Sequence, residues 1–237
     1  PPLETQKEIV AEIEGYQKVI DGARAVVDNY KPQIPIDQKW PVVDVRSVSE
    51  RITKGTTPTT GGHSYQTEGI TFLKVESIAE DGVLIPAKFA FISDDCHNEQ
   101  QRSQLKEGDV LFSIAGALGR VGLVPPDILP ANTNQALSII TPKTDLILGS
   151  YLFISLRTPE VLAQAEKQKT GAAQYNLSLQ QVGDLLIPLP PHAEQRAIVA
   201  EMGKEQAMVN ANRELIVRFE KKIQAVMDRV WGNGAAE

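Results

Sequence analysis

Apolar residues recur at every seventh position in two stretches of the chain, one toward each end. The first row contains Ile13, Ile20 and Val27, and the second contains Met202, Val209, Ile216, Ile223 and Val230. A neighbouring apolar row contains Tyr16 and Ala23 in the first stretch and Phe219 and Val226 in the second. A sustained repeat of seven predicts long helices that pair as a supercoil. An amphipathic helix packed on its own domain is the alternative interpretation of such a stripe.

The sequence around the start of each apolar row occurs twice. Pro1–Ile13 returns as Pro190–Met202, 189 residues later, and seven of the thirteen aligned pairs are identical. In both copies Pro-Pro precedes the heptad pattern, where a helix tolerates a missing N–H. The second helix is expected to extend from about Pro191 to Val230, because Gly232-Asn233-Gly234 then ends the pattern.

Between the two helices the pattern changes to short β-branched runs that Gly and Pro interrupt. Runs of this kind predict strands, here at Val42–Val45, Ile70–Val75, Val83–Ile92, Val110–Ile114, Val121–Val124, Ala136–Ile140 and Leu185–Pro190. Two helices are expected at Leu146–Leu156 and Pro159–Lys169. The sequence therefore predicts an α+β fold, with a mixed β-rich domain between long paired helices.

The charge balance is acidic, with 24 Lys and Arg against 30 Asp and Glu and a formal net charge of −6. The net charge is −2 for residues 1–36, −4 for 37–189 and 0 for 190–237. This balance argues against a polybasic nucleic-acid binder. Any nucleic-acid surface must therefore be a local patch.

Cysteine and histidine usage excludes several classes of site. A single cysteine, Cys96, rules out an internal disulfide framework or a multi-cysteine metal site, and it fits a reducing, cytoplasmic compartment. The three histidines are scattered and form no HExxH motif. No apolar run reaches the length needed to span a membrane.

Signatures of enzymes are missing from the sequence. There is no GxxxxGK[ST] phosphate loop and no GxSxG elbow. Gly116, Gly119 and Gly122 are spaced three apart, which differs from the dinucleotide fingerprint. We therefore expect a protein that binds rather than catalyses.

Three segments have the composition of loops that contact a ligand. Lys54–Gly62 offers hydroxyls, backbone N–H groups and a lysine, and Phe112–Gly122 offers small residues and Arg120. Lys167–Ser178 offers lysines, amides and an aromatic ring. Such groups suit DNA phosphates and base edges. The alternatives are a polar surface loop, a tight turn whose Arg120 pairs with a carboxylate, and a helix C-terminus closed by Gly171.

Together these segments resemble a known family. The chain is similar to the specificity (S) subunit of type I restriction–modification enzymes. The motifs that carry the resemblance are Lys54–Pro58, Gly108–Ser113, Gly119–Gly122, Asn134–Leu137, Thr170–Ser178, and Ile187–Pro191 followed by Glu194-Gln195. They cover essentially the whole chain, and the last motif, with its long helix, is the most specific.

The resemblance implies an organisation. A full S subunit is similar to two target-recognition domains that alternate with two conserved helices, and the helices pair antiparallel and set the spacing between two DNA half-sites. Residues 1–36 would then be a conserved helix and linker, 37–189 a target-recognition domain, and 190–237 the second conserved helix. This chain has two helices but one recognition domain. It therefore resembles either the second half of a subunit or a half-subunit that dimerises.

The resemblance also implies partners. They are double-stranded DNA, methyltransferase (M) subunits, restriction (R) subunits in the full complex, and a second copy of the chain through the helices. S-adenosylmethionine, ATP and magnesium would bind partner subunits, and no cofactor is expected on this chain. The helix residues expected to contact partners are the heptad residues given above together with Phe219.

Individual DNA-contacting residues are expected on the three loops and on the Asn134–Leu137 motif. They are Lys54, Thr56, Thr57, Thr59, Arg120, Gln135, Lys169, Gln174, Tyr175 and Asn176. The competing hypothesis is a coiled-coil scaffold or adaptor whose β domain binds protein, and the acidic balance is compatible with it.

Overall fold

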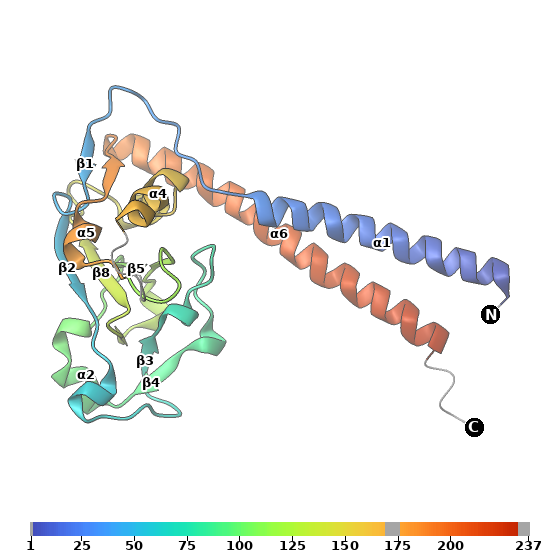
Figure 1. The fold of residues 1–237 in the computed structure, drawn as a ribbon, viewed down its shortest axis with the longest axis horizontal. Coiled ribbons are helices and arrows are strands. Elements are labelled where there is room, and N and C mark those ends of the chain that lie inside the picture. The colour runs from blue at the N-terminus through green and yellow to red at the C-terminus, as the bar shows by residue number, and fades with distance from the viewer. Residues whose placement is uncertain (1, 169–175, 232–237) are drawn as a thin grey trace. The chain divides into compact units, whose positions relative to one another are not determined.

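The chain folds into two compact units. The structure is a computed structural model, and it describes residues 2–168 and 176–231. One unit consists of Pro1–Lys31 and Ala200–Glu237, and the other of Pro32–Val199. Figure 1 labels the elements of both units. The helix α6 (His192–Trp231) begins in the second of these units and continues into the first.

The helical unit pairs α1 (Leu3–Asn29) with most of α6. The two helices are antiparallel (Figure 1), because Glu12 near the start of α1 meets Arg229 near the end of α6. Toward the other end of α1, Arg24 meets Glu220. The expected antiparallel helix pair and the extent of the second helix are confirmed.

The heptad residues lie on the less exposed side of both helices. Ile20, Met202 and Val209 are buried, as are Ala23 and Val226 of the neighbouring row. The other heptad residues are half-buried, as is Phe219: Ile13, Val27, Ile216, Ile223 and Val230. The repeat of seven therefore marks the apolar side of each helix.

The second unit is built on a four-stranded antiparallel sheet in the order β2-β8-β5-β6. Its strands are β2 (Ser49–Lys54), β8 (Leu137–Pro142), β5 (Val110–Ser113) and β6 (Val121–Leu123). Strands β5 and β8 are buried along their whole length. They contribute Leu111, Leu137 and Ile139 to a core cluster that also contains Leu73 and Ile78.

Two smaller sheets complete this unit. One has the order β4-β3-β7, formed by β4 (Ala90–Ile92), β3 (Ile70–Leu73) and β7 (Ala131–Thr133), with β3 and β7 parallel. The other pairs β1 (Val42–Asp44) with β9 (Leu186–Pro188). The predicted mixed, β-rich domain is confirmed.

Short helices and turns connect the strands. The α-helices are α2 (Asp94–Glu99), α3 (Gly149–Leu156), α4 (Pro159–Lys167) and α5 (Leu179–Gly183). Turns of 3-10 helix are η1 (Pro58–Gly61), η2 (Val75–Ser77), η3 (Pro86–Lys88), η4 (Gln101–Ser103) and η5 (Pro126–Ile128). No helix of the described residues is long and apolar enough to cross a membrane.

One predicted element is wrong, and several were not predicted. Val83–Ile92 is a strand only over its last three residues, because Pro86 begins the η3 turn in its middle. Strand β2 was missed because Ile52 is its only strongly apolar residue, and its pattern gives no alternation. The sequence pattern also left out β7, α2 and α5.

Candidate nucleic-acid interface

The topology of the main sheet brings several loops to one end. In the antiparallel order β2-β8-β5-β6, Lys54 at the end of β2 pairs with Ser138 near the start of β8. Ser113 at the end of β5 pairs with Leu137, and Phe112 pairs with Val121 at the start of β6. The loops that follow β2 and β5 and precede β8 and β6 therefore leave the sheet at the same end. We call this end the rim.

Gly55 allows the loop after β2 to lie directly against the loop between β7 and β8. A Cβ atom on Gly55 would lie 2.0 Å from the carbonyl oxygen of Thr133 and 2.4 Å from that of Asn134. The next residue is fixed by a backbone hydrogen bond from the N–H of Thr56 to Thr133 O (3.1 Å). Only a residue without a side chain permits this approach.

Polar side chains cluster at this contact and form two hydrogen-bonded pairs. The hydroxyl of Thr57 donates to Gln135 Oε1, and Arg102 Nη2 donates to Thr56 Oγ1 at 3.2 Å. Lys54 is exposed, and its side-chain ammonium makes no hydrogen bond or ion pair among the residues that the structure describes. The structure thus brings together five of the polar side chains around Gly55, four of them predicted from the sequence. Arg102 was missed, since it lies in a polar segment without a motif.

Thr59 lies in the η1 turn that follows this cluster, and it is exposed. Behind the turn, the ring of His63 contacts Glu99 Oε2 at 2.8 Å. The side-chain amide of Gln100 is buried next to Gly61 and has no hydrogen-bond partner among the described residues. The segment η1 therefore lies over α2 and η4, which carry Glu99 and Arg102.

The loop between β5 and β6 is a tight turn tied to Ser113. The hydroxyl of Ser113 accepts the N–H of Arg120 at 2.8 Å and donates to Ala117 O. Gly116 and Gly119 adopt φ values of 74° and 80°, which a side chain would strain. This turn holds a compact backbone at the rim.

Arg120 is half-buried and lies against the backbone. Its Nη1 donates to Ile78 O at 3.0 Å and to Val75 O at 3.4 Å. The alternative interpretation of the sequence was that Arg120 pairs with a carboxylate. In the structure its hydrogen bonds go to these backbone carbonyls. Arg120 thus joins the β5–β6 turn to η2, and part of its donor capacity is used inside the protein.

The described end of the third predicted loop, from Asn176 onward, lies beside this turn. Lys169, Gln174 and Tyr175 lie outside the described residues, whereas Asn176 is described and exposed. The next residue, Leu177, is buried, and its N–H donates to Ile114 O at 2.9 Å. Asn176 is therefore held at the same end of the sheet as Ser113.

A further lysine, Lys74, lies near the rim directly after strand β3. Leu73 at the end of β3 pairs with Thr133, so Lys74 directly follows this pairing. The ammonium of Lys74 contacts Glu76 Oε1 at 2.8 Å and lies 5.7 Å from the Tyr65 ring centroid. The hydrogen bond from Lys74 lowers the pKa of Glu76. This ion pair limits the positive charge that Lys74 can offer.

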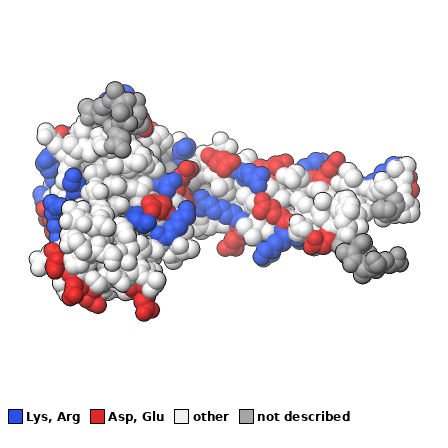
Figure 2. Space-filling model, turned by 60° about the horizontal axis from the view of Figure 1, so that its bottom comes forward, with Lys and Arg blue, Asp and Glu red and all other residues white. Residues whose placement is uncertain are grey.

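The charges of the molecule are mixed. On the face that Figure 2 shows, Lys and Arg side chains lie next to Asp and Glu, and broad areas carry neither. Exposed lysine and arginine at the rim are interspersed with hydroxyl and amide groups. Such a surface offers hydrogen bonds to base edges more than a continuous positive field.

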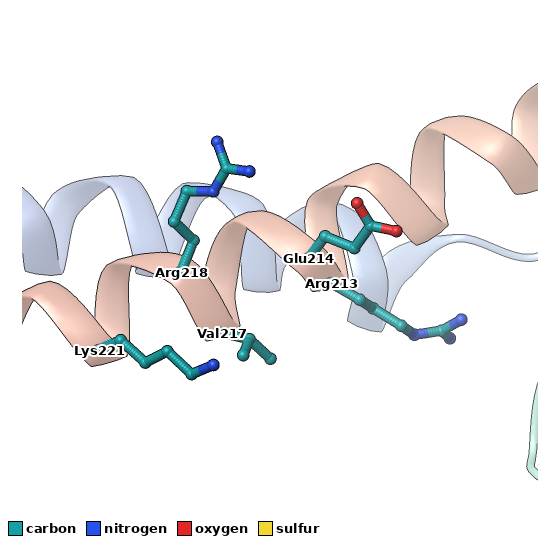
Figure 3. Close-up of a pocket in the computed structure, with 5 residues that line it drawn as sticks. All are labelled: Arg213, Glu214, Val217, Arg218 and Lys221. Atoms are coloured by element: carbon teal, nitrogen blue, oxygen red, sulfur yellow. The ribbon is translucent and has the colours of Figure 1, made fainter.

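No group of three or more His, Cys, Asp or Glu suited to a metal ion occurs among residues 2–168 and 176–231. A surface depression on α6 is lined by Arg213, Glu214, Val217, Arg218 and Lys221. Figure 3 shows Glu214 and Arg218 pointing away from the side on which Val217 and Lys221 lie. All five residues belong to one helix, so this is an open groove on a helix surface. Ligand sites are usually enclosed clefts or cavities.

Comparison with known proteins shows the family of the chain. The family model for the type I restriction modification DNA specificity domain matches residues 37–207. The chain belongs to this family. The matched range contains the main sheet and every described loop of the rim, so the specificity domain includes the polar cluster around Gly55.

Relatives of the specificity domain are longer proteins. The chain is 29% identical over 163 residues to the type I restriction enzyme EcoBI specificity subunit of Escherichia coli, and the match covers 69% of this chain and 32% of that protein. It is 23% identical over 210 residues to the putative type I restriction enzyme MjaX specificity subunit of Methanocaldococcus jannaschii, covering 85% and 48%. The chain thus spans less than half the length of these relatives.

Solved structures share the fold. The crystal structure of the HsdS subunit from Thermoanaerobacter tengcongensis matches with a TM-score of 0.61 at 20% identity, covering 87% of this chain and 53% of that one. A chain from a structure on complex assembly and conformational transition of the type I R-M system matches with a TM-score of 0.62 at 20% identity, covering 97% and 59%. At this identity the likeness supports the fold alone.

Proposed function

We propose that this chain is a DNA sequence-specificity module of a type I restriction–modification system, and that its rim contacts one half of a bipartite target. The observation that carries the proposal is the convergence of three loops, the one after β2, the one between β5 and β6 and the one before β8, at one end of the β2-β8-β5-β6 sheet, with Arg102 of η4 against the first of them. These loops place hydroxyl, amide and guanidinium groups side by side on a fixed backbone. Groups of this kind donate to and accept from base edges in the major groove. Residues 37–189 act as the recognition domain.

The helices provide the second part of the proposed function. An antiparallel pair with exposed polar faces is a rigid spacer, and α6 extends over 40 residues. At about 1.5 Å per residue this corresponds to roughly 60 Å. We propose that the helical unit binds methyltransferase subunits, and that restriction subunits join in the full complex. Catalysis and its cofactors then belong to those partners.

Association of two copies through the helices is also proposed. In one chain α1 already pairs with α6, so a dimer would form by exchange of a helix between copies, which reproduces the same contacts. Sedimentation should then give twice the chain mass of 25.9 kDa. Ile216→Asp and Ile223→Asp should abolish the dimer. A monomer in the parent chain would contradict dimerisation and leave DNA recognition untouched.

The function is tested by methylome sequencing of cells that express the chain with its methyltransferase subunits. A split methylated motif that disappears when the chain is omitted is the expected result. Methylation without any motif would contradict the proposal. A gel shift with and without the methyltransferase separates the remaining alternative, because a protein-binding adaptor predicts no dependence on DNA sequence.

Contact of the rim with DNA is tested by Lys54→Ala. This lysine is exposed and unpaired among the described residues, so its removal should weaken binding of all duplexes and reduce the salt dependence of binding by about one charge. Lys39→Ala is the matched control, because Lys39 is equally exposed and lies before β1, outside the rim. Equal effects of the two variants would place the DNA elsewhere.

A further inference from the structure

We propose that Arg102 is a specificity-determining residue that contacts a guanine of the DNA target. The inference rests on the proposed function, and it names guanine as the base that this part of the rim contacts. Arg102 lies in η4, a turn that no sequence motif marks. Its guanidinium reaches the loop after β2, where it donates to Thr56 Oγ1 at 3.2 Å.

The backbone beneath Arg102 is firmly held. Ser103 is fully buried, and its N–H donates to Gln100 O at 2.8 Å. Two residues further on, the N–H of Leu105 donates to Ala131 O at 2.9 Å, which ties the end of the turn to β7. A fixed backbone lowers the entropy cost of presenting a long side chain to DNA.

The side chain of Arg102 retains free donors. A guanidinium carries five N–H donors in a planar fork, and a single hydrogen bond, to Thr56, is formed by Arg102 in the described part of the chain. It forms no ion pair with a carboxylate there, and the residue is exposed. The remaining edge of the fork suits the O6 and N7 acceptors of guanine, which arginine contacts as a pair.

Three other arginines of this unit are already engaged. Arg120 contacts the carbonyls of Ile78 and Val75, Arg46 pairs with Asp184 at 2.8 Å, and Arg51 lies 3.5 Å from the buried Asp109. Their carboxylate or carbonyl partners compete with a base. Arg102 is held by a neutral hydroxyl, which orients the guanidinium without neutralising it.

The partner of Arg102 is itself fixed within the rim. The backbone N–H of Thr56 donates to Thr133 O, and the hydroxyl of Thr57 donates to Gln135 Oε1. The pairs Arg102–Thr56 and Thr57–Gln135 are therefore neighbours, joined through the backbone of the adjacent residues Thr56 and Thr57. A fixed orientation favours contact with one base, whereas a mobile lysine such as Lys54 suits phosphate.

The test uses the assembled complex and the methylome. Arg102→Ala should relax one specified G·C position of the motif, raising methylation of sites with another base there by about tenfold. Arg102→Lys should relax the same position, because an ammonium keeps the charge and loses the two-donor fork. Arg46→Ala is the matched control, since Arg46 is exposed and lies at the opposite end of the sheet. The methylated motif obtained with this control variant should be unchanged.

The outcomes separate this inference from the proposed function. An absent motif with the unaltered chain would overturn the proposed function whatever Arg102 does. With a motif present, uniform loss of methylation at every site in Arg102→Ala would indicate a phosphate contact and overturn the guanine assignment. Arg102→Gln guards against misfolding, because it preserves a donor toward Thr56. An unchanged motif in that variant would equally overturn the inference.

Discussion

Tyr16 of α1 and Phe219 of α6 meet edge to face, with ring centroids 5.5 Å apart and ring planes inclined by 69°. The ammonium of Lys222 lies 4.5 Å from the Phe219 centroid and 5.4 Å from that of Tyr16. The Tyr16 hydroxyl donates a hydrogen bond to Glu12, and the guanidinium of Arg229 donates a second one to the same carboxylate. The hydrogen bond from Arg229 lowers the pKa of Glu12. The aromatic pair thus connects the apolar contact between the two helices with the ion pair of Glu12 and Arg229.

Removing these rings should loosen the helix pair. Tyr16→Ala and Phe219→Ala are each expected to cost about 2 kcal/mol, with a coupling of about 1 kcal/mol in the double-mutant cycle. Amide hydrogen exchange in α1 measures the effect on this unit alone. Met208→Ala on α6 is the control, because Met208 is 59% exposed. Additive effects of the two variants would show that the rings stabilise the helices separately.

Gly55→Ala should disrupt the rim. A Cβ atom there would overlap the carbonyl oxygens of Thr133 and Asn134, so the two loops must separate. We expect a loss of about 3 kcal/mol in the free energy of unfolding and loss of the methylated motif. Gly22→Ala should act oppositely, because nothing lies within 4 Å of its Cβ position, two turns before the end of α1. That variant should stabilise the helix by about 0.5–1 kcal/mol, and destabilisation by both variants alike would contradict the steric argument.

The two long helices and most central strands follow directly from the sequence. The repeat of seven in Ile13, Ile20 and Val27 gave the helix pair, and β-branched runs gave β5, β6 and β8. Strand β2 escaped because its residues are mostly polar and half-buried. Its pairing with β8 is set by the tertiary fold, which overrides a weak local pattern.

The polar cluster around Gly55 was only partly predictable. Composition singled out Thr56, Thr57 and Gln135, but sequence spacing gives no measure of which loops meet across a sheet. Arg102 stands 46 positions from Thr56, its hydrogen-bond partner. A polar turn without apolar periodicity carries no signal for such a contact. Conversely, Arg120 fitted a DNA-contacting pattern, whereas the structure engages it with backbone carbonyls.

Asp109 should make stability depend on pH. Burial raises the pKa of this carboxyl, although hydrogen bonds from Thr141 (2.6 Å) and the N–H of Lys106 favour its charged form. A raised pKa in the folded state means that this group stabilises the fold fully below the ordinary Asp pKa of about 3.9. The contribution is lost as pH rises through the higher folded-state value.

Asp109→Asn removes that titration. The unfolding free energy of the wild type minus that of the variant should therefore fall as pH rises above about 4, measured by urea unfolding at a series of pH values. Thr141→Val, which deletes a hydrogen bond to the charged form, should steepen the decline. A difference that grows with pH would mean that Arg51 and the hydrogen bonds outweigh burial.

Gln195 holds the first turns of α6 against the rest of the unit Pro32–Val199 by three hydrogen bonds. Its Oε1 accepts the N–H of Leu148, and its Nε2 donates to Leu146 O and Pro190 O, all at 2.9 Å. The residue is fully buried, so Gln195→Ala leaves three backbone groups without a partner. We expect a cost of about 2–4 kcal/mol, seen as faster amide exchange in the neighbouring α3 and β9.

Gln195→Glu separates hydrogen bonding from packing. A carboxylate fills the same volume and still accepts from Leu148, but it faces two carbonyl oxygens without a proton to donate. The variant should therefore be as unstable as Gln195→Ala at neutral pH and should recover on acidification, when the carboxyl is protonated. Gln206→Ala, farther along α6, is the control, since among the described residues its side-chain amide donates to Asn210 alone. If Gln195→Ala costs no more than this control, the three hydrogen bonds do not hold the helix to its domain.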